Sequence, residues 1–417
     1  MQKNNQKIWD LIIIGGGASG MMSGVVSSRL KKSVLLLEKN NNLGEKLKIT
    51  GGGRCNITNA EFDIHAFLKN YGKSKDFLYT PFSIFGVEDT FKFFEELGLP
   101  LIVEARKRAF PESQKAFDVY NVLKKELDRN KVEIKNNCQV FKFIKDNDGR
   151  LVGVKTKLGD FFAKSFILAT GGTSHPETGS TGDGFKFLKD LGHKIEKPSP
   201  SVVPLEVSNK WVHLLSGISL SFMKITFFLD GKKQFSKTGK ILFTHFGLSG
   251  PLILNSASRV GSLLEAGSVD AYIDAYPDTD FGSLENKIIK VFDENKNKFF
   301  KNIIKDFVPD GTSKAFEILF DFIDDNKKVH SITKDERKKI VNILKNLPIH
   351  ITNLMGYDRA VVVDGGLPLT ELNMKKMQSK IYDNLFITGD LLNINRQSGG
   401  FGLQICWTTG YISGINA

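Results

Sequence analysis

Three glycines near the start of the chain have the spacing of a phosphate-binding turn. Gly15, Gly17 and Gly20 spell G-x-G-x-x-G, and the apolar run over residues 11–14 precedes them. In such a turn the first glycine allows a tight bend, the second lets backbone approach a pyrophosphate, and the third lets the next helix pack closely on the strand. The N–H groups that begin the helix form an anion site. The sequence therefore predicts a dinucleotide-binding β-α-β unit.

An acidic residue stands where the ribose of a bound dinucleotide would lie. Glu38 ends the second apolar run, residues 33–37, about twenty residues beyond the glycine turn. A carboxylate at this place accepts hydrogen bonds from ribose hydroxyls and repels a 2′-phosphate. We therefore expect the adenosine half of the ligand to carry no 2′-phosphate.

A second glycine cluster follows soon after Glu38. Residues 51–56 read Gly-Gly-Gly-Arg-Cys-Asn, and Lys46 lies just upstream. Consecutive glycines disfavour the interior of a helix, so we predict a loop that lies close to a flat or bulky group. A flexible linker is the alternative, and the donors Lys46, Arg54 and Asn56 fit it poorly.

Glycine-rich strand ends recur later in the chain. A buried strand over residues 165–168 runs into Ala-Thr-Gly-Gly at 169–172, and one over 384–388 runs into Gly389-Asp390. The last helix is expected to begin near Gly399. Ligands bind at strand ends in α/β sheets. Because the sheet is completed only near the C-terminus, the nucleotide domain is predicted to be discontinuous, which favours the longer FAD over NAD as cofactor.

The apolar pattern predicts an α/β protein with two inserted units. We expect an FAD-binding domain over residues 1–193 and 349–417. Short alternating runs with turn signals between them indicate a β-rich unit over 194–282, and lysine-rich segments with helical spacing indicate a helical unit over 283–348. Within the first part, helices are predicted over residues 90–97 and 116–127, and a basic turn over 106–111.

Composition limits the class of protein. The chain has 417 residues, 41% hydrophobic and 25% charged, as is usual for globular proteins of more than one domain. No apolar run approaches the ~20 residues of a membrane span, so we expect a cytoplasmic protein without membrane contact. The net charge of +12 favours anionic partners, but the lysines are spread along the chain, which makes nucleic-acid binding unlikely as a specific function. Three widely separated cysteines indicate neither a disulfide framework nor a metal site.

Several motifs together resemble the aminoacetone-oxidase-like flavoproteins, the BaiN- and YhiN-like family. They are the glycine turn, residues 44–47 with the loop 51–56, Arg108-x-Phe110-Pro111, residues 169–172, Thr-His-x-Gly-x-Ser-Gly-Pro over 244–251, and the Gly389-Asp390 segment. The resemblance covers essentially the whole chain. It implies a glutathione-reductase-type Rossmann domain that binds FAD, with an inserted β-barrel-like subdomain and a small helical subdomain.

The resemblance also implies cofactor contacts at particular positions. They are Gly15, Gly17, Ala18, Ser19 and Gly20 at the pyrophosphate, Glu38 at the ribose, Lys46, Gly53, Arg54, Cys55 and Asn56 beside the flavin, the backbone of Val140 near the adenine, and Thr170, Gly171, Gly389, Asp390, Gly400, Phe401, Gly402 and Leu403. This chain departs from the family's common Gly-Glu and Thr-Gly-Gly-Tyr-Asn patterns at Gly389-Asp390 and over residues 398–402. The substrate and the tuning of the flavin ring can differ accordingly.

The predicted function is that of an FAD-dependent oxidoreductase acting on a small organic molecule, by amine oxidation or by double-bond reduction. NAD(P)H or O₂ would dock transiently, since the chain has no second strand–glycine–helix unit. A flavin-dependent RNA-modifying protein and a non-catalytic flavin sensor are the alternatives. His245 is the first candidate for a proton donor or substrate anchor, with a structural histidine as the alternative. The oligomeric state is not indicated.

Overall fold

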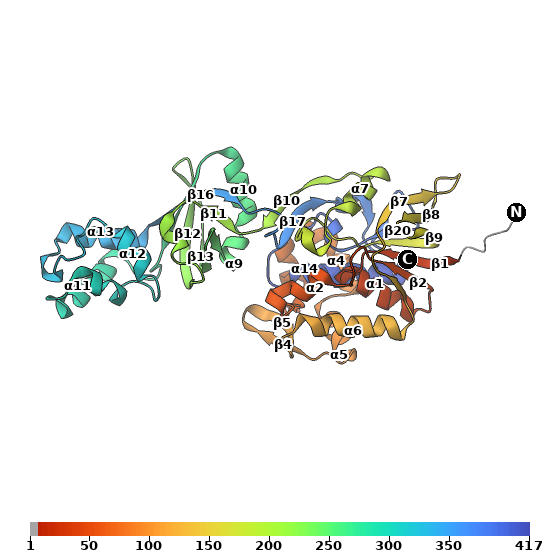
Figure 1. Cartoon of the computed structure of the whole chain (residues 1–417), viewed down its shortest axis with the longest axis horizontal. Coiled ribbons are helices and arrows are strands. Elements are labelled where there is room, and N and C mark those ends of the chain that lie inside the picture. The colour runs from red at the N-terminus through yellow and green to blue at the C-terminus, as the bar shows by residue number, and fades with distance from the viewer. Residues whose placement is uncertain (1–6) are drawn as a thin grey trace. The chain divides into compact units, whose positions relative to one another are not determined.

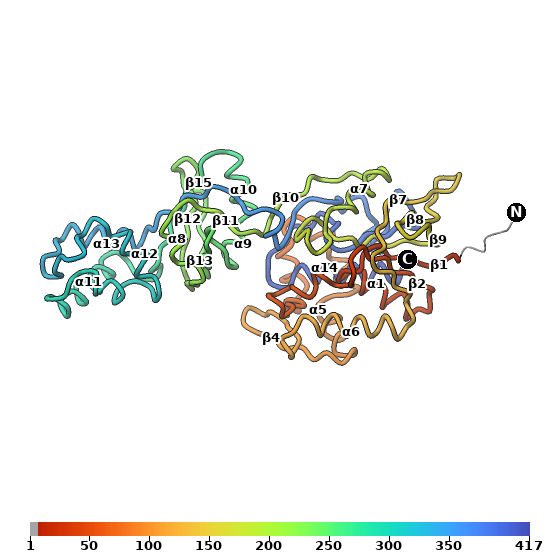
Figure 2. Tube along the Cα trace, in the orientation of Figure 1, coloured from red at the N-terminus to blue at the C-terminus, as the bar shows by residue number. Residues whose placement is uncertain are grey.

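The structure, a computed structural model, describes residues 7–417 and contains two compact units. The first unit comprises the chain up to Ser199 together with Val361–Ala417, and the second comprises Pro200–Ala360. The trace leaves the first unit once and returns to it once (Figure 2). The predicted discontinuity of the nucleotide domain is therefore confirmed. The finer boundaries at residues 193, 282 and 348 stay predictions.

The central sheet of the first unit joins strands from both ends of the chain (Figure 1). Its order is β18-β19-β20-β9-β1-β2-β6, and β8 joins β7 to β9. The strands are β1 (Ile8–Ile14), β2 (Val34–Leu37), β6 (Glu133–Lys135), β7 (Val140–Lys145), β8 (Leu151–Thr156), β9 (Gly159–Leu168), β18 (Leu372–Asn373), β19 (Gln378–Ser379) and β20 (Leu385–Ile387). Strands β20, β9, β1, β2 and β6 pair in parallel. Their carboxyl ends therefore meet at one edge of the sheet.

The parallel strands are apolar because they are covered on both faces. Leu11, Ile12 and Ile13 in β1 are fully buried, as are Leu35 and Leu36 in β2. A continuous run of branched residues is typical of strands with this environment. The register aligns Ile14 with Leu168 of β9, and Leu168 with Ile387 of β20. The turns that follow these three strands consequently lie together.

Two helices cross closely on this sheet. Helix α1 (Ala18–Arg29) follows the glycine turn, and α14 (Phe401–Asn416) packs along it. The hydroxyls of Ser23 and Ser27 donate to the carbonyls of Gly410 and Gly414, each at 2.9 Å. A Cβ atom built on Gly410 would lie 2.6 Å from the Ser19 carbonyl oxygen. Small residues therefore hold the C-terminal helix against the first one. The structure begins α14 at Phe401, close to the expected Gly399.

Further helices of the first unit surround the sheet. They are α2 (Glu45–Ile49), α3 (Ile64–Leu68), α4 (Lys75–Ile84), α5 (Val87–Glu96), α6 (Ala116–Arg129) and α7 (Asp183–Asp190). The predicted helices over residues 90–97 and 116–127 are confirmed as α5 and α6. Their apolar faces bury Phe93, Phe94, Leu123 and Leu127 in the core.

The predicted basic turn over residues 106–111 is wrong. Ala105–Lys107 form a short 3-10 helix, and Arg108–Pro111 form strand β5, which lies between β3 (Thr58–Asn59) and β4 (Leu101–Glu104). The physical reason is the burial of Ala109 and Phe110. Ala109 pairs with Thr58 of β3 and with Val103 of β4, and Phe110 pairs with Ile102 of β4. The turn itself is confined to Arg106 and Lys107, both at positive φ.

The second unit contains a closed antiparallel barrel of order β11-β14-β13-β12-β15-β16. The strands are β11 (Leu205–Val207), β12 (Ser219–Leu229), β13 (Lys232–Thr244), β14 (Gly247–Ser249), β15 (Val269–Asp274) and β16 (Leu347–Leu354), with helices α8 (Lys210–His213), α9 (Pro251–Leu254), α10 (Ala257–Ala266), α11 (Phe281–Glu294), α12 (Ser313–Leu319) and α13 (Lys334–Lys345). Rings of Phe292, Phe300, Phe307 and Phe320 pack together among the helices. Strand β16 follows α13 and closes the barrel by pairing with β11 and β15. The expected inserted barrel and helical subdomain are confirmed.

Strands β10 (Glu196–Val202) and β17 (Val362–Gly366) form a separate two-stranded sheet.

Replacing Gly20 with alanine is expected to destabilise the first unit. A Cβ atom at this position would lie 1.9 Å from the carbonyl oxygen of Gly15, so α1 must move off β1. We expect the free energy of unfolding of the FAD-free protein, measured with urea, to fall by about 2–3 kcal/mol. In the matched variant Gly17→Ala the new Cβ meets no atom within 4 Å, and the change should stay below about 1 kcal/mol. Equal stability of the two variants would contradict the close packing of α1 on β1.

Candidate functional site

The glycine turn after β1 forms an open cradle at the start of α1. Gly15 has φ +102°, and a Cβ there would lie 2.5 Å from the Ala169 carbonyl oxygen, so only glycine fits. Gly17 is the N-cap of α1, and a Cβ built on it meets nothing within 4 Å. The first N–H groups of a helix have no partner within the helix. Open space beside these donors, over Gly17 and Ala18, is what a pyrophosphate requires.

Glu38 is fixed beside this cradle. Its carboxylate accepts hydrogen bonds from the N–H groups of Gly16 at 2.7 Å and Asn40 at 2.8 Å, and the residue is only 7% exposed. Burial raises the pKa of Glu38 despite these two hydrogen bonds. Each carboxylate oxygen keeps further acceptor capacity for a ribose hydroxyl. The N–H of Cys138 donates to the Glu38 carbonyl at 2.8 Å, which brings the segment leading to Val140 alongside.

The loop over residues 51–56 is a left-handed turn tied to the C-terminal glycines. Gly51, Gly52 and Gly53 have φ values of +58°, +67° and +85°, and a Cβ on Gly52 or Gly53 meets nothing within 4 Å. With its amide oriented to satisfy its neighbours, Asn56 accepts from the Gly400 N–H at 3.0 Å and donates to the Thr58 carbonyl at 3.0 Å. The loop over residues 51–56 and the segment at Gly400, both predicted to lie beside the flavin, are therefore hydrogen-bonded to each other. The flexible-linker alternative does not fit this anchoring.

Arg54 and Cys55 have side chains with structural partners. The Arg54 guanidinium forms an ion pair with Glu104, and its central carbon lies 4.1 Å from the centre of the Phe110 ring. Cys55 is fully buried at φ +59°, and burial raises the pKa of its thiol to about 12. Its side chain therefore packs in the core. A cofactor contact from Cys55 would have to come from its backbone.

A buried ion pair follows β20. The Arg396 side chain, 3% exposed, pairs with Asp390 and donates from Nη1 to the Ile394 carbonyl at 3.0 Å. Its Nε is buried and has no hydrogen-bond partner. Gly402 makes room for the guanidinium, since a Cβ there would lie 3.1 Å from Nε. Arg396 is not among the residues that the sequence predicted for the site. A lone arginine six residues after the Gly389-Asp390 turn was the available signal.

The charges around this pair are perturbed by burial. Burial lowers the pKa of Lys46, whose ammonium donates to the Ser174 hydroxyl at 3.0 Å, although Asp390 opposes the shift. Burial raises the pKa of the Cys406 thiol to about 12, and the charge of Asp390 adds to the effect. Burial also disfavours the charged form of Arg396, but Asp390 and the other groups around the guanidinium together raise its pKa. Lys46, Arg396 and Asp390 thus form a cluster with two potential positive charges and one negative charge.

The turns after β9 and β20 contribute polar groups and close contacts. The hydroxyls of Thr170 and Thr173 are buried and find no hydrogen-bond partner among residues 7–417. Gly171 has φ +72°, and Gly389 has φ +63° with its built Cβ only 2.9 Å from the Ser19 hydroxyl. The Thr388 hydroxyl donates to the Ser19 hydroxyl at 3.1 Å, which ties the start of α1 to the end of β20.

Gly400 and Phe401 contact neighbouring segments of the first unit and leave no free side chain for a ligand. Gly400 has φ +103°, and a Cβ there would lie 2.3 Å from the Thr58 carbonyl carbon. The Phe401 ring packs in the core, 5.1 Å from the ring of Phe67, and its carbonyl accepts from the Tyr71 hydroxyl at 3.0 Å. The side chain of Phe401 is therefore unavailable to a ligand.

The site fits an extended dinucleotide. Glu38 after β2, the open cradle over Gly17 after β1, the hydroxyl of Thr170 after β9 and Asp390 of the charged cluster after β20 follow one another along the carboxyl edge of the sheet. FAD has a diphosphate, a ribose and a ribityl chain for such groups. The individual contacts stay predictions.

His245 belongs to the second unit. It lies in the turn between β13 and β14 and is exposed, and its carbonyl oxygen accepts from Nδ1 of His213 at 2.6 Å. Its ring packs against Phe246, with 4.9 Å between ring centres. The glycine-rich turn expected around it is present. Its role as a proton donor or substrate anchor stays a prediction.

The cradle on a discontinuous Rossmann sheet defines the class of protein: it is an FAD-dependent oxidoreductase. Residues 9–416 match the family model described as the HI0933-like protein Rossmann domain, and the chain belongs to this family. The flavoprotein resemblance of the motifs is thereby confirmed. Within residues 7–417, no helix combines the length and apolar character needed to cross a membrane.

Relatives match over nearly their full length. The 3-dehydro-bile acid delta(4,6)-reductase of Clostridium scindens is 27% identical, covering 96% of this chain and 97% of the relative. The ribosomal RNA dihydrouridine synthase of Haemophilus influenzae is 27% identical over 97% of each chain. Among solved structures, the 3-ketosteroid-delta4-(5alpha)-dehydrogenase of Rhodococcus jostii RHA1 is 12% identical with a TM-score of 0.54, covering 100% of this chain and 98% of that one. This last likeness supports the fold.

Replacing Glu38 with alanine is expected to weaken FAD binding. The change removes one or two charge-assisted hydrogen bonds to the ribose, at about 1.5–3 kcal/mol each, so the Kd should rise by at least about tenfold. Quenching of FAD fluorescence on titration with FAD-free protein measures it. The matched variant Glu88→Ala, at an exposed position in α5, should bind FAD as the unaltered protein does. An unchanged Kd in Glu38→Ala would remove Glu38 from the site.

Replacing only Arg396 of the Arg396–Asp390 pair is expected to lower the free energy of unfolding more than replacing both residues. Arg396→Leu leaves Asp390 partly buried without its partner, and the free energy of unfolding of the FAD-free protein should fall by about 3 kcal/mol. The double variant Asp390→Asn, Arg396→Leu should recover most of this loss. Arg129→Leu serves as the control, because Arg129 is 80% exposed in its pair with Glu126 and should change stability by less than about 1 kcal/mol. Additive losses in the double variant would contradict the coupling.

Proposed function

We propose that this protein uses FAD to reduce a carbon–carbon double bond conjugated to a carbonyl group in a small organic molecule. The observation that carries the proposal is a chemical feature common to two relatives that match over almost their whole length. The name of the 3-dehydro-bile acid delta(4,6)-reductase refers to double bonds that are conjugated to the 3-oxo group of its substrate. Dihydrouridine is uridine with its ring double bond, conjugated to a carbonyl, reduced.

Both reductions add a hydride and a proton across the double bond. A conjugated carbonyl makes the β carbon electrophilic, so a hydride adds there and a proton adds to the α carbon. Bound FAD in its reduced form supplies the hydride. The protein must orient the substrate, exclude water and place a proton donor. We assign no residue of the first unit to proton donation, and His245 remains the candidate from the second.

The positive cluster supports reductive chemistry. Lys46 and Arg396 are held close to the turns after β9 and β20, where the flavin contacts are expected. Helix α14, with its N-cap at Gly400, adds backbone N–H donors at the same edge. Fixed positive charge and donors stabilise negative charge that develops on reduction, and they do so more strongly away from bulk water. These groups favour a cofactor that is readily reduced.

Electrons are proposed to come from NAD(P)H that docks transiently. The glycine-rich residues 179–184 run into α7, but a 3-10 turn at Pro176–Thr178 precedes them in place of a strand. They therefore lack the strand–turn–helix unit that binds a resident dinucleotide. The net charge of +12 leaves RNA as the rival substrate, in keeping with the name of the Haemophilus influenzae relative.

The test is an anaerobic two-step experiment on the FAD-bound protein. NADH or NADPH is added first, and bleaching of the oxidised-flavin absorbance is followed by stopped flow. Cyclohex-2-enone or a 3-oxo-4-ene bile acid is then added, and the absorbance should return as the double bond is reduced. The saturated ketone serves as the control and should leave the flavin reduced. Mass spectrometry of the product should show a gain of two hydrogen atoms.

Other outcomes identify other functions. Return of absorbance with uridine-containing RNA alone, in a salt-sensitive manner, would replace the small-molecule proposal with RNA modification. Bleaching by an amine such as aminoacetone, without NAD(P)H, would indicate amine oxidation with O₂ as acceptor. Failure of every donor to bleach the flavin would indicate a sensor.

A further inference from the structure

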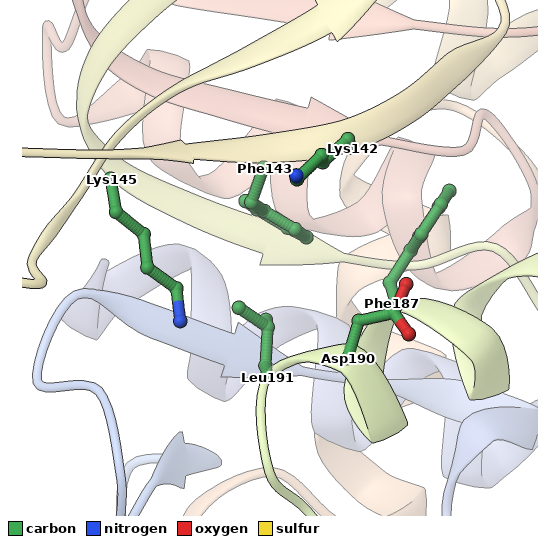
Figure 3. A pocket seen from close by; sticks show the side chains of 6 residues that line it. All are labelled: Lys142, Phe143, Lys145, Phe187, Asp190 and Leu191. Atoms are coloured by element: carbon green, nitrogen blue, oxygen red, sulfur yellow. The ribbon is translucent and has the colours of Figure 1, made fainter.

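A second pocket lies in the first unit, away from the glycine cradle. It has a volume of about 340 Å³ and is lined by Lys142, Phe143 and Lys145 of β7 and by Phe187, Asp190 and Leu191 at the end of α7 (Figure 3). None of these six residues is among the predicted FAD contacts. The pocket is therefore unexplained by the oxidoreductase function.

The floor of the pocket is apolar and rigid. Phe143, Phe187 and Leu191 are only 5–6% exposed, so they are packed in the core and offer a firm surface. The rings of Phe143 and Phe187 meet edge to face, with centres 6.2 Å apart and planes at 87°. Such a floor matches the flat apolar body of an aryl group.

An irregularity in β7 separates the two lysines that line this pocket. In a regular strand residues 142 and 145 would point to opposite faces of the sheet. The pairing of β7 with β8 shifts register between Val140 and Lys142 and again between Ile144 and Lys145. A bulge re-aims the side chains that follow it. Lys142 and Lys145 consequently both line the pocket, on either side of Phe143 (Figure 3).

The charges at the rim are not cancelled by neighbours. The Lys145 ammonium donates to the Tyr382 hydroxyl at 2.7 Å and lies 5.1 Å from that ring's centre, which orients the ammonium group. Among residues 7–417, no carboxylate lies within ion-pair distance of Lys142 or Lys145 in this structure. Asp190 borders the opposite side of the pocket. The two lysines and the aspartate sum to one positive charge, which suits a monoanion better than a dianion.

We propose that this pocket between β7 and α7 binds a small organic carboxylate with a flat apolar body, independently of the FAD site. The aryl or similarly flat part lies on Phe143, Phe187 and Leu191. The carboxylate is held by Lys142 and Lys145. Asp190 disfavours ligands with a second negative charge.

The probe for this site is 2-naphthoate, titrated into the FAD-bound protein by isothermal titration calorimetry. Its uncharged analogue, 2-naphthalenemethanol, measures the apolar part alone. We expect the carboxylate to bind about tenfold more tightly than the alcohol, from two partly exposed charge contacts. This preference should shrink as salt is added. Equal affinity of the two compounds, or no binding of 2-naphthoate at millimolar concentration, would overturn the proposal without any variant.

A double variant locates the binding. Lys142→Met, Lys145→Met keeps the apolar stems of both side chains and should remove the tenfold preference, while Lys157→Met, at an exposed position after β8, should retain it. Far-ultraviolet circular dichroism and the flavin absorbance confirm that both proteins are folded and loaded. An unchanged preference in the double variant would place the anion elsewhere and reject this pocket. Since NAD(P)H turnover plays no part in the readout, failure of the proposed reductase activity would leave this result standing.

Discussion

The contact between the start of helix α1 and the turn after β1 is the constraint on which the rest of the site depends. Gly20 faces the Gly15 carbonyl with no room for a Cβ, and Gly15 in turn faces Ala169 at the end of β9. The helix can begin over the strand ends only because these side chains are missing. The space over Gly17 and the unpaired N–H groups of α1 follow from that placement. A phosphate-binding cradle is thus a product of backbone proximity more than of polar side chains.

The same principle holds the C-terminal segment in place. Gly410 and Gly414 let α14 approach α1, and Gly400 lets the loop before α14 touch Thr58. Polar side chains then stabilise these close approaches with hydrogen bonds. Ser23 and Ser27 donate to backbone carbonyls of α14, and Asn56 accepts from the N–H of Gly400. The positive charge near the predicted flavin contacts is fixed by this packing, because Arg396 lies between Asp390 and the Gly402 position.

The features that sequence alone revealed are those encoded locally. The glycine turn, Glu38 and the alternation of helices and strands depend on neighbours within about forty residues, and each leaves a spacing that can be recognised. Strand β5 was missed because two residues at positive φ, Arg106 and Lys107, mask the buried Ala109-Phe110 pair beside them. Arg396 was missed because its pairing with Asp390 and its contact with Gly402 depend on how the loop over residues 390–402 folds, which follows no regular spacing. The closure of the barrel by β16 likewise depends on pairing with β11, about 140 residues earlier, a distance over which no sequence pattern extends.

The order of the chain also affects how the protein can acquire its cofactor. The sheet edge that forms the cradle includes β20, and α14 covers α1, so segments more than 350 residues apart in the chain complete one site. Domains tend to fold as they emerge, and the barrel with its helices can do so before α14 exists. Until then α1 exposes Met22, Val25 and Val26 without the α14 surface that buries part of it. The complete cofactor site is therefore available only after α14 has been synthesised and has packed on α1.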